Sequence, residues 1–299
     1  VQEGVTAEAS ALAGHQELGN LIVLWDRNHI SIEEDTDVAF TEDVPARYRA
    51  YGWDVQRVDW TKTGNYVEDV QELYNAIERA KTVTDKPSFI EVRTIIGYPA
   101  PNKQNTGSVH GSKLGVEEIV ETKKVLGFDP EKSFFIEDEV LAHTRELRER
   151  GAAAHKVWNE KFEAWAQANP ERAKLYNRLV SGEMPVDYKA AFPVFEPGTS
   201  LATRAASGKV INAIADTFPE LWGGSADLAG SNLTTINNAE SFNPVSHSTE
   251  DWTGNPYGRV LHFGIREQGA AAIVNGIVLS SPTRAFSGTF FVFSDYQRP

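Results

Sequence analysis

Short apolar runs alternate with helical patterns along this chain, and that alternation constrains the fold more than any other feature. Residues 20–25 form a continuous apolar run of the kind that is buried on both faces of a parallel sheet. An alanine-rich helix is expected before it, at 5–18. Further strands are expected at 53–58 and 88–95, and residues 66–81 between them carry apolar side chains at helical spacing. Strands that alternate with helices in this way indicate an α/β fold with a parallel sheet.

A second α/β unit follows a proline-rich stretch. Residues 169–200 interrupt the alternation, so we expect a linker there. It would separate a first domain at 1–168 from a second at 201–299. The second domain repeats the pattern, with helices expected at 203–218 and 266–279 and strands near 220–223, 259–263 and 283–293.

A long charged helix is expected just before the linker, at 137–168. It carries Trp158, Phe162 and Trp165 as a stripe at helical spacing. Because such stripes usually pack against a neighbouring element, we interpret this one as a packing face rather than a ligand site.

Charge and composition exclude several classes of function. The net charge of −13 argues against a nucleic-acid surface, because phosphate backbones are bound by clustered lysine and arginine. No apolar run approaches the roughly 20 residues that cross a bilayer, so no membrane partner is expected. The absence of cysteine excludes disulfides and thiolate metal sites and is consistent with a reducing, cytoplasmic compartment. The chain starts at Val1 rather than at methionine, and we interpret it as a fragment.

Polar groups follow the first expected strand. Asn28 and the carbonyl of Ile30 come directly after it, where ligands bind in open parallel sheets. Oxygen ligands of this kind suit Mg²⁺, which shares its coordination with phosphates. Asparagine after a strand is also a common turn residue, so the pattern alone leaves both interpretations open.

Two loops carry candidates for contacts with an anion. His110 lies in Gly107-Ser-Val-His-Gly111, where an imidazole can donate to a phosphate or shuttle a proton, although a surface histidine is the simpler interpretation. Arg204 precedes the run Gly223-Gly-Ser-Ala-Asp-Leu-Ala-Gly-Ser-Asn-Leu233. A guanidinium binds phosphate through two parallel hydrogen bonds, and small residues let the backbone approach a ligand. The alternative interpretation is that this run of small residues is an ordinary turn after a strand.

Glu267 opens an expected apolar helix. A glutamate at a helix start compensates the helix dipole, which is one interpretation of this residue. The other is a carboxylate whose pKa is raised by apolar surroundings, so that it can share a proton with a ligand. Phe290, Phe293 and Tyr296 follow at intervals of three. A stripe like this usually belongs to a core, but it also suits the wall of a pocket for an aromatic heterocycle.

Taken in order, these motifs resemble the transketolase family along nearly the whole chain. The matching motifs are Gln-Glu-Gly-x-x-x-Glu-Ala at the start, Asn-x-Ile, Val-His-Gly, Ala-Thr-Arg, Gly-Gly-Ser-Ala-Asp-Leu-x-x-Ser-Asn-Leu, Gly-Ile-Arg-Glu and Gly-Thr-Phe-x-x-Phe-x-x-Tyr. The resemblance implies an enzyme that transfers a two-carbon ketol unit from a ketose phosphate to an aldose phosphate in the pentose phosphate pathway, through a thiamine diphosphate carbanion. It also implies a homodimer with its active site at the subunit interface.

The same resemblance implies two thiamine-diphosphate-binding-type parallel-sheet domains, both incomplete here. Residues 1–168 resemble the later part of the diphosphate- and metal-binding domain, and 201–299 the early part of the pyrimidine-binding domain. The aspartate of the family's Gly-Asp-Gly metal motif would lie before Val1, and the third domain would follow residue 299. The isolated fragment is therefore expected to be inactive.

Residue roles follow from the resemblance position by position. Asn28 and the Ile30 carbonyl resemble ligands of Mg²⁺, or of Ca²⁺ or Mn²⁺ in its place. Glu267 resembles the carboxylate that bonds the pyrimidine nitrogen and, with His110, is the expected catalytic residue. The other implied contacts are Glu3 supporting Glu267 across the dimer interface, Asp227 near the cofactor, Phe290, Phe293 and Tyr296 around the pyrimidine, and His110, Arg204 and Ser231 on the sugar phosphate.

Several alternatives stay open or are excluded by particular residues. Gln268 and Ser287 depart from the family's usual histidine and glycine, which puts catalytic efficiency in question rather than the family. Dihydroxyacetone synthase shares the motifs, whereas Ser-Ala-Asp-Leu and Val-His-Gly disfavour a deoxyxylulose-phosphate synthase. A non-catalytic dimerisation module is disfavoured by the retained Glu267, Asn28 and Arg204. A Rossmann dehydrogenase is excluded because no Gly-x-Gly-x-x-Gly follows a strand.

Overall fold

The computed structural model describes residues 1–298, which divide into two compact units by their internal contacts. The first unit comprises residues 1–28, 37–94 and the chain from 184 onward. The second comprises residues 29–36 and 95–183. The first unit holds two parallel sheets, and the second is mainly helical.

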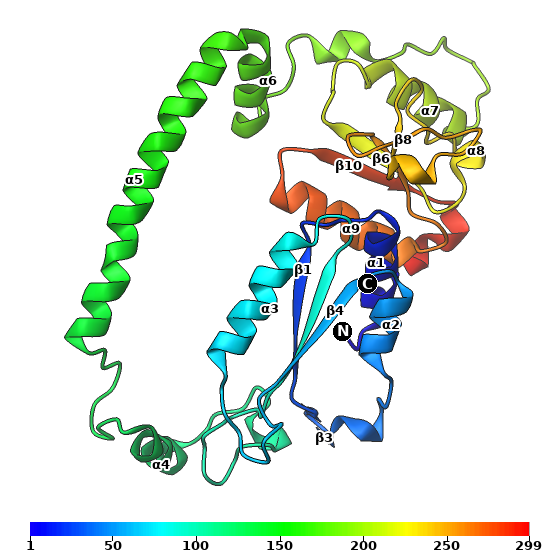
Figure 1. The fold of residues 1–299 in the computed structure, drawn as a ribbon. Helices are drawn as coiled ribbons and strands as arrows, with labels where there is room; N and C mark the ends of the chain where they lie inside the picture. Colours follow the sequence, from blue (N-terminus) through cyan, green and yellow to red (C-terminus); the bar gives the residue numbers. More distant parts are fainter. Residues whose placement is uncertain (299) are drawn as a thin grey trace. The chain divides into compact units, whose positions relative to one another are not determined.

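The first sheet has three parallel strands in the order β1-β5-β4 (Figure 1). Its central strand β5 is buried at Ser88 through Val92, and alternate residues face opposite sides. Phe89 packs on one face and Ile90 on the other. The elements are α1 (Gly4–His15), β1 (Ile22–Arg27), α2 (Val44–Ala50), β4 (Asp54–Asp59), α3 (Val70–Thr82) and β5 (Ser88–Arg93).

The expectation that the run at 20–25 is buried on both faces is not met within residues 1–298. Strand β1 lies at an edge of its sheet, and Leu24 in it is 46% exposed. The fully buried strand is β5, which has a neighbour on each side. The order of the strands in the sheet decides which apolar strand is enclosed, and that order cannot be predicted from the residues of one strand alone.

The second sheet has five strands in the order β10-β6-β9-β7-β8, all paired in parallel. Residues Ile236 and Val260 lie in a core on one side, and Leu261, Phe263 and Ala270 lie in another. Its elements are α7 (Thr203–Ile214), β6 (Leu221–Ser225), α8 (Ala229–Asn232), β7 (Ser241–Phe242), η4 (Val245–His247), β8 (Gly254–Asn255), β9 (Val260–His262), α9 (Glu267–Ser280), β10 (Arg284–Gly288) and η5 (Phe291–Tyr296).

Helix α1 contributes to the cores of both sheets. Its residue Ala13 packs with Phe89 and Tyr48 in the core of the first sheet. Its neighbour Leu12, 4% exposed, packs with Leu261 and Phe263 in the core of the second. Adjacent residues of one helix therefore join the two sheets into a single compact unit.

The predicted strand at 283–293 is too long. Strand β10 ends at Gly288, and residues 291–296 form the 3-10 helix η5. In a 3-10 helix, side chains three residues apart lie on the same side. The interval of three between Phe293 and Tyr296 therefore reflects this turn, and their ring centroids lie 6.4 Å apart.

The second unit is mainly helical. Its long helix α5 carries the stripe that was interpreted as a packing face, and Phe162 contacts Trp158 at 5.0 Å and Tyr176 of α6 at 5.1 Å between ring centroids. The packing interpretation is confirmed for Phe162, whereas Trp158 and Trp165 are 49% and 37% exposed. The unit contains β2 (Ile30–Ser31), β3 (Glu34–Asp35), η2 (Gly107–Val109), α4 (Val116–Leu126), α5 (Asp138–Ala168) and α6 (Pro170–Ser181), with η1 (Thr36–Val38) and η3 (Tyr188–Ala191) at its borders.

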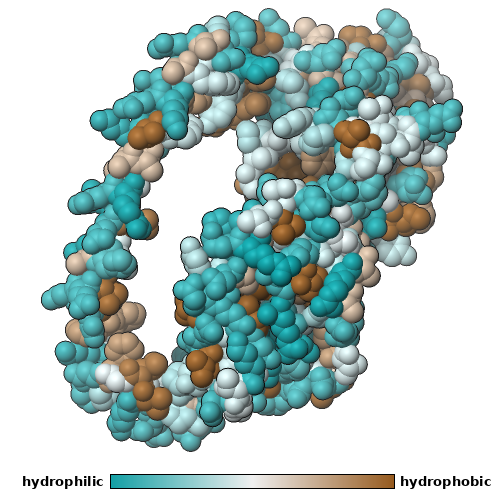
Figure 2. Space-filling model, viewed as in Figure 1, coloured by the Kyte–Doolittle hydropathy of each residue, from teal (hydrophilic) through white to brown (hydrophobic). Residues whose placement is uncertain are grey.

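The surface is mainly polar. Figure 2 shows a largely hydrophilic face with separate hydrophobic patches rather than a continuous apolar band. Within residues 1–298, every helix is too short or too polar to cross a bilayer.

Candidate functional site

The carboxyl ends of the second sheet carry most of the candidate residues. Strand β6 ends at Ser225, ahead of Asp227 and Ser231, and β10 ends at Gly288, two residues before Phe290. Ligands in parallel sheets bind at this edge. The sheet therefore brings together segments that lie more than sixty residues apart in the sequence.

Ser225 fixes this edge through its hydroxyl group. The hydroxyl donates to the Gly288 carbonyl at 3.1 Å and accepts from Leu228 N–H at 3.0 Å and Asn232 Nδ2 at 3.1 Å. Ser225 is 4% exposed, so these bonds replace those to water. One hydroxyl thus joins the ends of two strands to the turn that carries Asp227, whose φ of 60° is a left-handed conformation.

The glycines of the Gly-Gly-Ser run serve packing inside the sheet. They lie in β6 itself, and the turn begins only after Ser225. A Cβ on Gly224 would stand 1.7 Å from the Leu261 carbonyl oxygen, and one on Gly223 would stand 2.3 Å from the Phe286 ring. The expectation that these small residues let the backbone approach a ligand is therefore wrong, because protein atoms already occupy that space.

A pocket of about 710 Å³ opens between α7 and the end of β10. It brings Arg204, at the start of α7, together with Phe290. Asn232 and Thr234 line it and are 8% and 6% exposed. Arg204 itself is exposed, so its guanidinium is accessible to a ligand. The pocket lining does not include Asp227, Ser231 or Glu267, which lie elsewhere along the same edge.

Glu267 is the first residue of α9 and is half-buried. The same helix start receives a second carboxylate, because Glu8 of α1 accepts from Gly269 N–H at 2.8 Å. That bond satisfies one of the free N–H groups at the start of the helix. Glu8 was missed as a site residue, although it is the second glutamate of the quoted Gln-Glu-Gly-x-x-x-Glu-Ala motif. Glu3 is exposed at the start of α1.

Two of the aromatic candidates, Phe293 and Tyr296, belong to η5, and Phe290 directly precedes it; η5 packs against α9. Phe290 is half-buried, whereas Phe293 and Tyr296 are 36% and 64% exposed. This chain therefore leaves much aromatic surface uncovered beside the helix that begins at Glu267.

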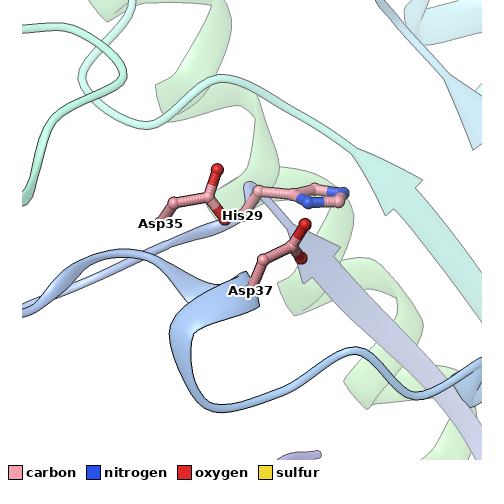
Figure 3. Close-up of side chains that lie close together, drawn as sticks. All are labelled: His29, Asp35 and Asp37. Atoms are coloured by element: carbon pink, nitrogen blue, oxygen red, sulfur yellow. The ribbon is translucent and has the colours of Figure 1, made fainter.

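The candidate metal ligands lie in one local turn after β1. Asn28 follows the strand directly, and Ile30 opens β2, which pairs with β3 through Ile30 and Asp35. Figure 3 shows the side chains of His29, Asp35 and Asp37 gathered in this turn, with their possible ligand atoms within 4.8 Å of one another. Exposed acidic groups commonly gather without a bound ion, so we assign no metal to these three.

His110 lies in a loop that is tied down on both sides of it. Glu34 of β3 accepts from Gly107 N–H at 2.8 Å, and a Cβ on Gly107 would stand 2.9 Å from the Ser31 carbonyl oxygen. Further along, Lys103 Nζ donates to the Leu114 carbonyl at 2.7 Å. His110 is exposed, and its ring makes no hydrogen bond to residues 1–298.

Glu118 anchors the start of this loop. Its Oε1 accepts from the N–H groups of Asn102 and Lys103 at 2.7 and 3.0 Å, and its Oε2 accepts from Asn102 Nδ2 at 2.8 Å. The Asn102 side chain is the main cause of a lowered pKa for Glu118, and the two backbone N–H groups and the Lys103 charge act the same way against the effect of burial. The sequence offered only a glutamate in a first helical turn, which does not distinguish it from its neighbour Glu117.

Two sequence profiles match the chain. One described as "Transketolase, thiamine diphosphate binding domain" matches residues 1–185, and one described as "Transketolase, pyrimidine binding domain" matches residues 199–299. The thiamine diphosphate-binding domain of this family is therefore present in the chain, as the sequence predicted.

Named relatives agree with these profiles. The transketolase of Mycobacterium tuberculosis is 55% identical and that of Geobacillus stearothermophilus 45% identical, each over 300 aligned residues and all of this chain. The chain spans 42% and 43% of the length of these two relatives.

Solved structures share the fold. A Pichia stipitis transketolase in complex with sedoheptulose-7-phosphate superimposes with a TM-score of 0.91 at 39% identity, over 99% of this chain and 43% of the other. The Leishmania mexicana transketolase gives 0.89 at 35% identity, over 99% and 42%. The α/β fold with parallel sheets is confirmed, and the chain belongs to the transketolase family.

Proposed function

We propose that the complete protein carrying this chain is a transketolase that moves a two-carbon ketol unit from a ketose phosphate to an aldose phosphate. The observation that carries the proposal is the position of Glu267 at the start of α9, the helix against which η5 with its exposed rings packs. Thiamine diphosphate, when bound, supplies the nucleophilic carbon that accepts the two-carbon unit. The protein residues bind and orient the reactants and control one proton.

The aromatic segment suits the pyrimidine ring. Uncovered flat side chains at Phe293 and Tyr296 offer stacking surfaces, and Phe290 adds a half-buried ring next to them. A half-buried carboxylate at a neighbouring helix start suits a hydrogen bond to a ring nitrogen. Glu267 would share a proton between its carboxylate oxygen and that ring nitrogen. Asp227 would lie near the cofactor.

The turn after β1 suits the diphosphate end. The Asn28 amide and the Ile30 carbonyl are hard oxygen ligands directly after a strand, and Mg²⁺ binds such groups together with phosphate oxygens. Arg204, exposed at the pocket rim, would bind the sugar phosphate with a charge-assisted bond, and His110 and Ser231 would contact its hydroxyl groups.

The proposal includes a homodimer. Phe291 and Val292 of η5 are 91% and 75% exposed, and a second copy would cover such apolar side chains next to the aromatic candidates. Glu3, exposed at the start of α1, would then support Glu267 of the other subunit.

The test uses Glu267→Gln in the complete protein, with the exposed Glu250→Gln as control. If Glu267 shares a proton with the pyrimidine, the substitution keeps its shape but slows C2 proton exchange of bound thiamine diphosphate about 10²-fold or more. Transfer between sugar phosphates should fall in parallel, while the unfolding midpoint stays near that of the control. Fast exchange in Glu267→Gln would leave this residue as a helix-dipole partner only.

A further inference from the structure

The imidazole of the candidate His110 is exposed and makes no hydrogen bond, ion pair or ring contact within residues 1–298. The ring makes no hydrogen bond within residues 1–298, and only its backbone N–H is bonded, to the Gly107 carbonyl at 3.0 Å. A side chain of this kind takes its position from the loop that carries it. What holds the loop therefore determines where the imidazole lies.

The start of the loop is held by a single buried carboxylate. Glu118 is 6% exposed and accepts three hydrogen bonds, two from the backbone of Asn102 and Lys103 and one from the Asn102 side chain. It lies in the first turn of α4, where the helix dipole favours a negative charge. Because both carboxylate oxygens are engaged, the direction of the chain at Lys103 is fixed.

The end of the loop is held by the residue that Glu118 fixes. Lys103 sends its ammonium group to the Leu114 carbonyl at 2.7 Å, and its own carbonyl accepts from Thr106 Oγ1 at 2.7 Å. The contact with Leu114 closes residues 103–114 into a loop with joined ends, with His110 inside it, and the contact with Thr106 fixes the first turn of that loop. Without the carboxylate, Lys103 N–H would lose its acceptor, and the chain beside it would be held by the backbone bonds of Gln104 and Asn105 to Ala100 and Ile96.

We propose that Glu118 and Lys103 are positioning residues, which together hold His110 where the sugar phosphate meets it. The proposal rests on the proposed function for the substrate, but the closure of the loop is a property of the chain alone. Neither residue contacts the imidazole, so both act through the backbone of residues 103–114.

The first arm of the test measures the loop directly. Hydrogen exchange is followed in Glu118→Ala, with Glu117→Ala as the matched control, because Glu117 is the exposed neighbour in the same helical turn and makes no side-chain hydrogen bond or ion pair within residues 1–298. Amides of residues 103–114 should exchange roughly tenfold faster or more in Glu118→Ala only. The amides of α4 beyond its first turn should keep their protection, which shows that the helix carrying Glu118 stays folded.

The second arm measures function in the complete protein. Lys103→Met should raise KM for a ketose phosphate by roughly tenfold, with a smaller change in kcat, because a displaced His110 weakens binding of the sugar phosphate. Lys103→Arg keeps a donor for the Leu114 carbonyl and should restore much of the loss. Glu118→Gln, which keeps acceptors for part of the network, should lie between Glu118→Ala and the natural protein.

Each outcome decides a different point. Equal exchange in Glu118→Ala and Glu117→Ala overturns the loop closure. Faster exchange at 103–114 with an unchanged KM overturns the positioning role. If the complete protein transfers no two-carbon unit, the proposed function fails, and calorimetric binding of a ketose phosphate to Lys103→Met and Lys103→Arg then decides positioning in place of KM.

Discussion

The turn after β6 and the loop before α4 both carry candidate residues, yet they are held by opposite kinds of contact. Ser225 holds the turn with a neutral hydroxyl buried inside the sheet, and Gly224 lets the strands approach closely. Glu118 and Lys103 hold the loop with charged groups. The turn therefore depends on neutral hydrogen bonds and close packing, whereas the loop depends on charged groups. Because the two kinds of contact respond to different perturbations, separate experiments should distinguish them.

The largest effect is expected where packing is tightest. Gly224→Ala places a Cβ 1.7 Å from the Leu261 carbonyl oxygen, which belongs to the neighbouring strand and cannot move without breaking the pairing of β6 with β9. We expect the free energy of unfolding to fall by about 3 kcal/mol or more, measured by urea denaturation.

The control makes the same substitution at Gly276, in the exposed part of α9, where a Cβ would meet no atom within 4 Å. There alanine should raise stability by roughly 0.5–1 kcal/mol, because it suits a helix better than glycine does. Equal losses at the two positions would contradict the packing role of β6.

Removal of the Ser225 hydroxyl should have an intermediate effect. Ser225→Ala leaves Leu228 N–H and Asn232 Nδ2 without their acceptor in a buried place, which costs about 1–3 kcal/mol of unfolding free energy. The exposed Ser246→Ala is the matched control. Thermal unfolding measures both, and a Ser225→Ala protein as stable as the control would show that water replaces the hydroxyl.

Acid should produce the smallest effect and confine it to the loop. The pKa of Glu118 is lowered from its ordinary 4.5, chiefly by Asn102, so its contribution to stability is complete above pH 4.5 and is lost as the pH falls through the lower value in the folded state. Protection factors for residues 103–114 should therefore drop first on acidification.

The turn at residues 225–232 serves as the internal reference for that measurement, because its central contacts are neutral. A simultaneous loss of protection in both segments would mean that the charged loop has no separate acid sensitivity.

Much of the fold was predictable because it depends on local periodicity. The alternation of apolar runs and helices predicted both parallel sheets, and the stripe at Phe162 predicted its packing face. The exposure of β1 was not predictable, because it depends on which strands lie next to it. The length of β10 was also missed, since Phe290 and Phe293 read as strand residues although the chain turns after Gly288.

The candidate site divides in the same way. Arg204, Glu267 and the aromatic candidates were found from ordered motifs, and their individual roles stay predictions. Ser225, Glu8 and Glu118 act through partners that only folding supplies, such as the Gly288 carbonyl, which lies 63 residues beyond Ser225. No spacing rule within one segment identifies a contact of that range.

Helix α1 packs in the cores of both sheets, and this limits how the chain can be divided into separate pieces. If residues 201–298 were produced alone, the core around Leu261, Phe263 and Ala270 would lack Leu12 and present an apolar surface to water. Residues 1–94 alone would expose Leu12 in turn. The pieces should therefore aggregate separately but complement each other when mixed, and recombination between relatives should succeed only when α1 and the second sheet are inherited from the same parent.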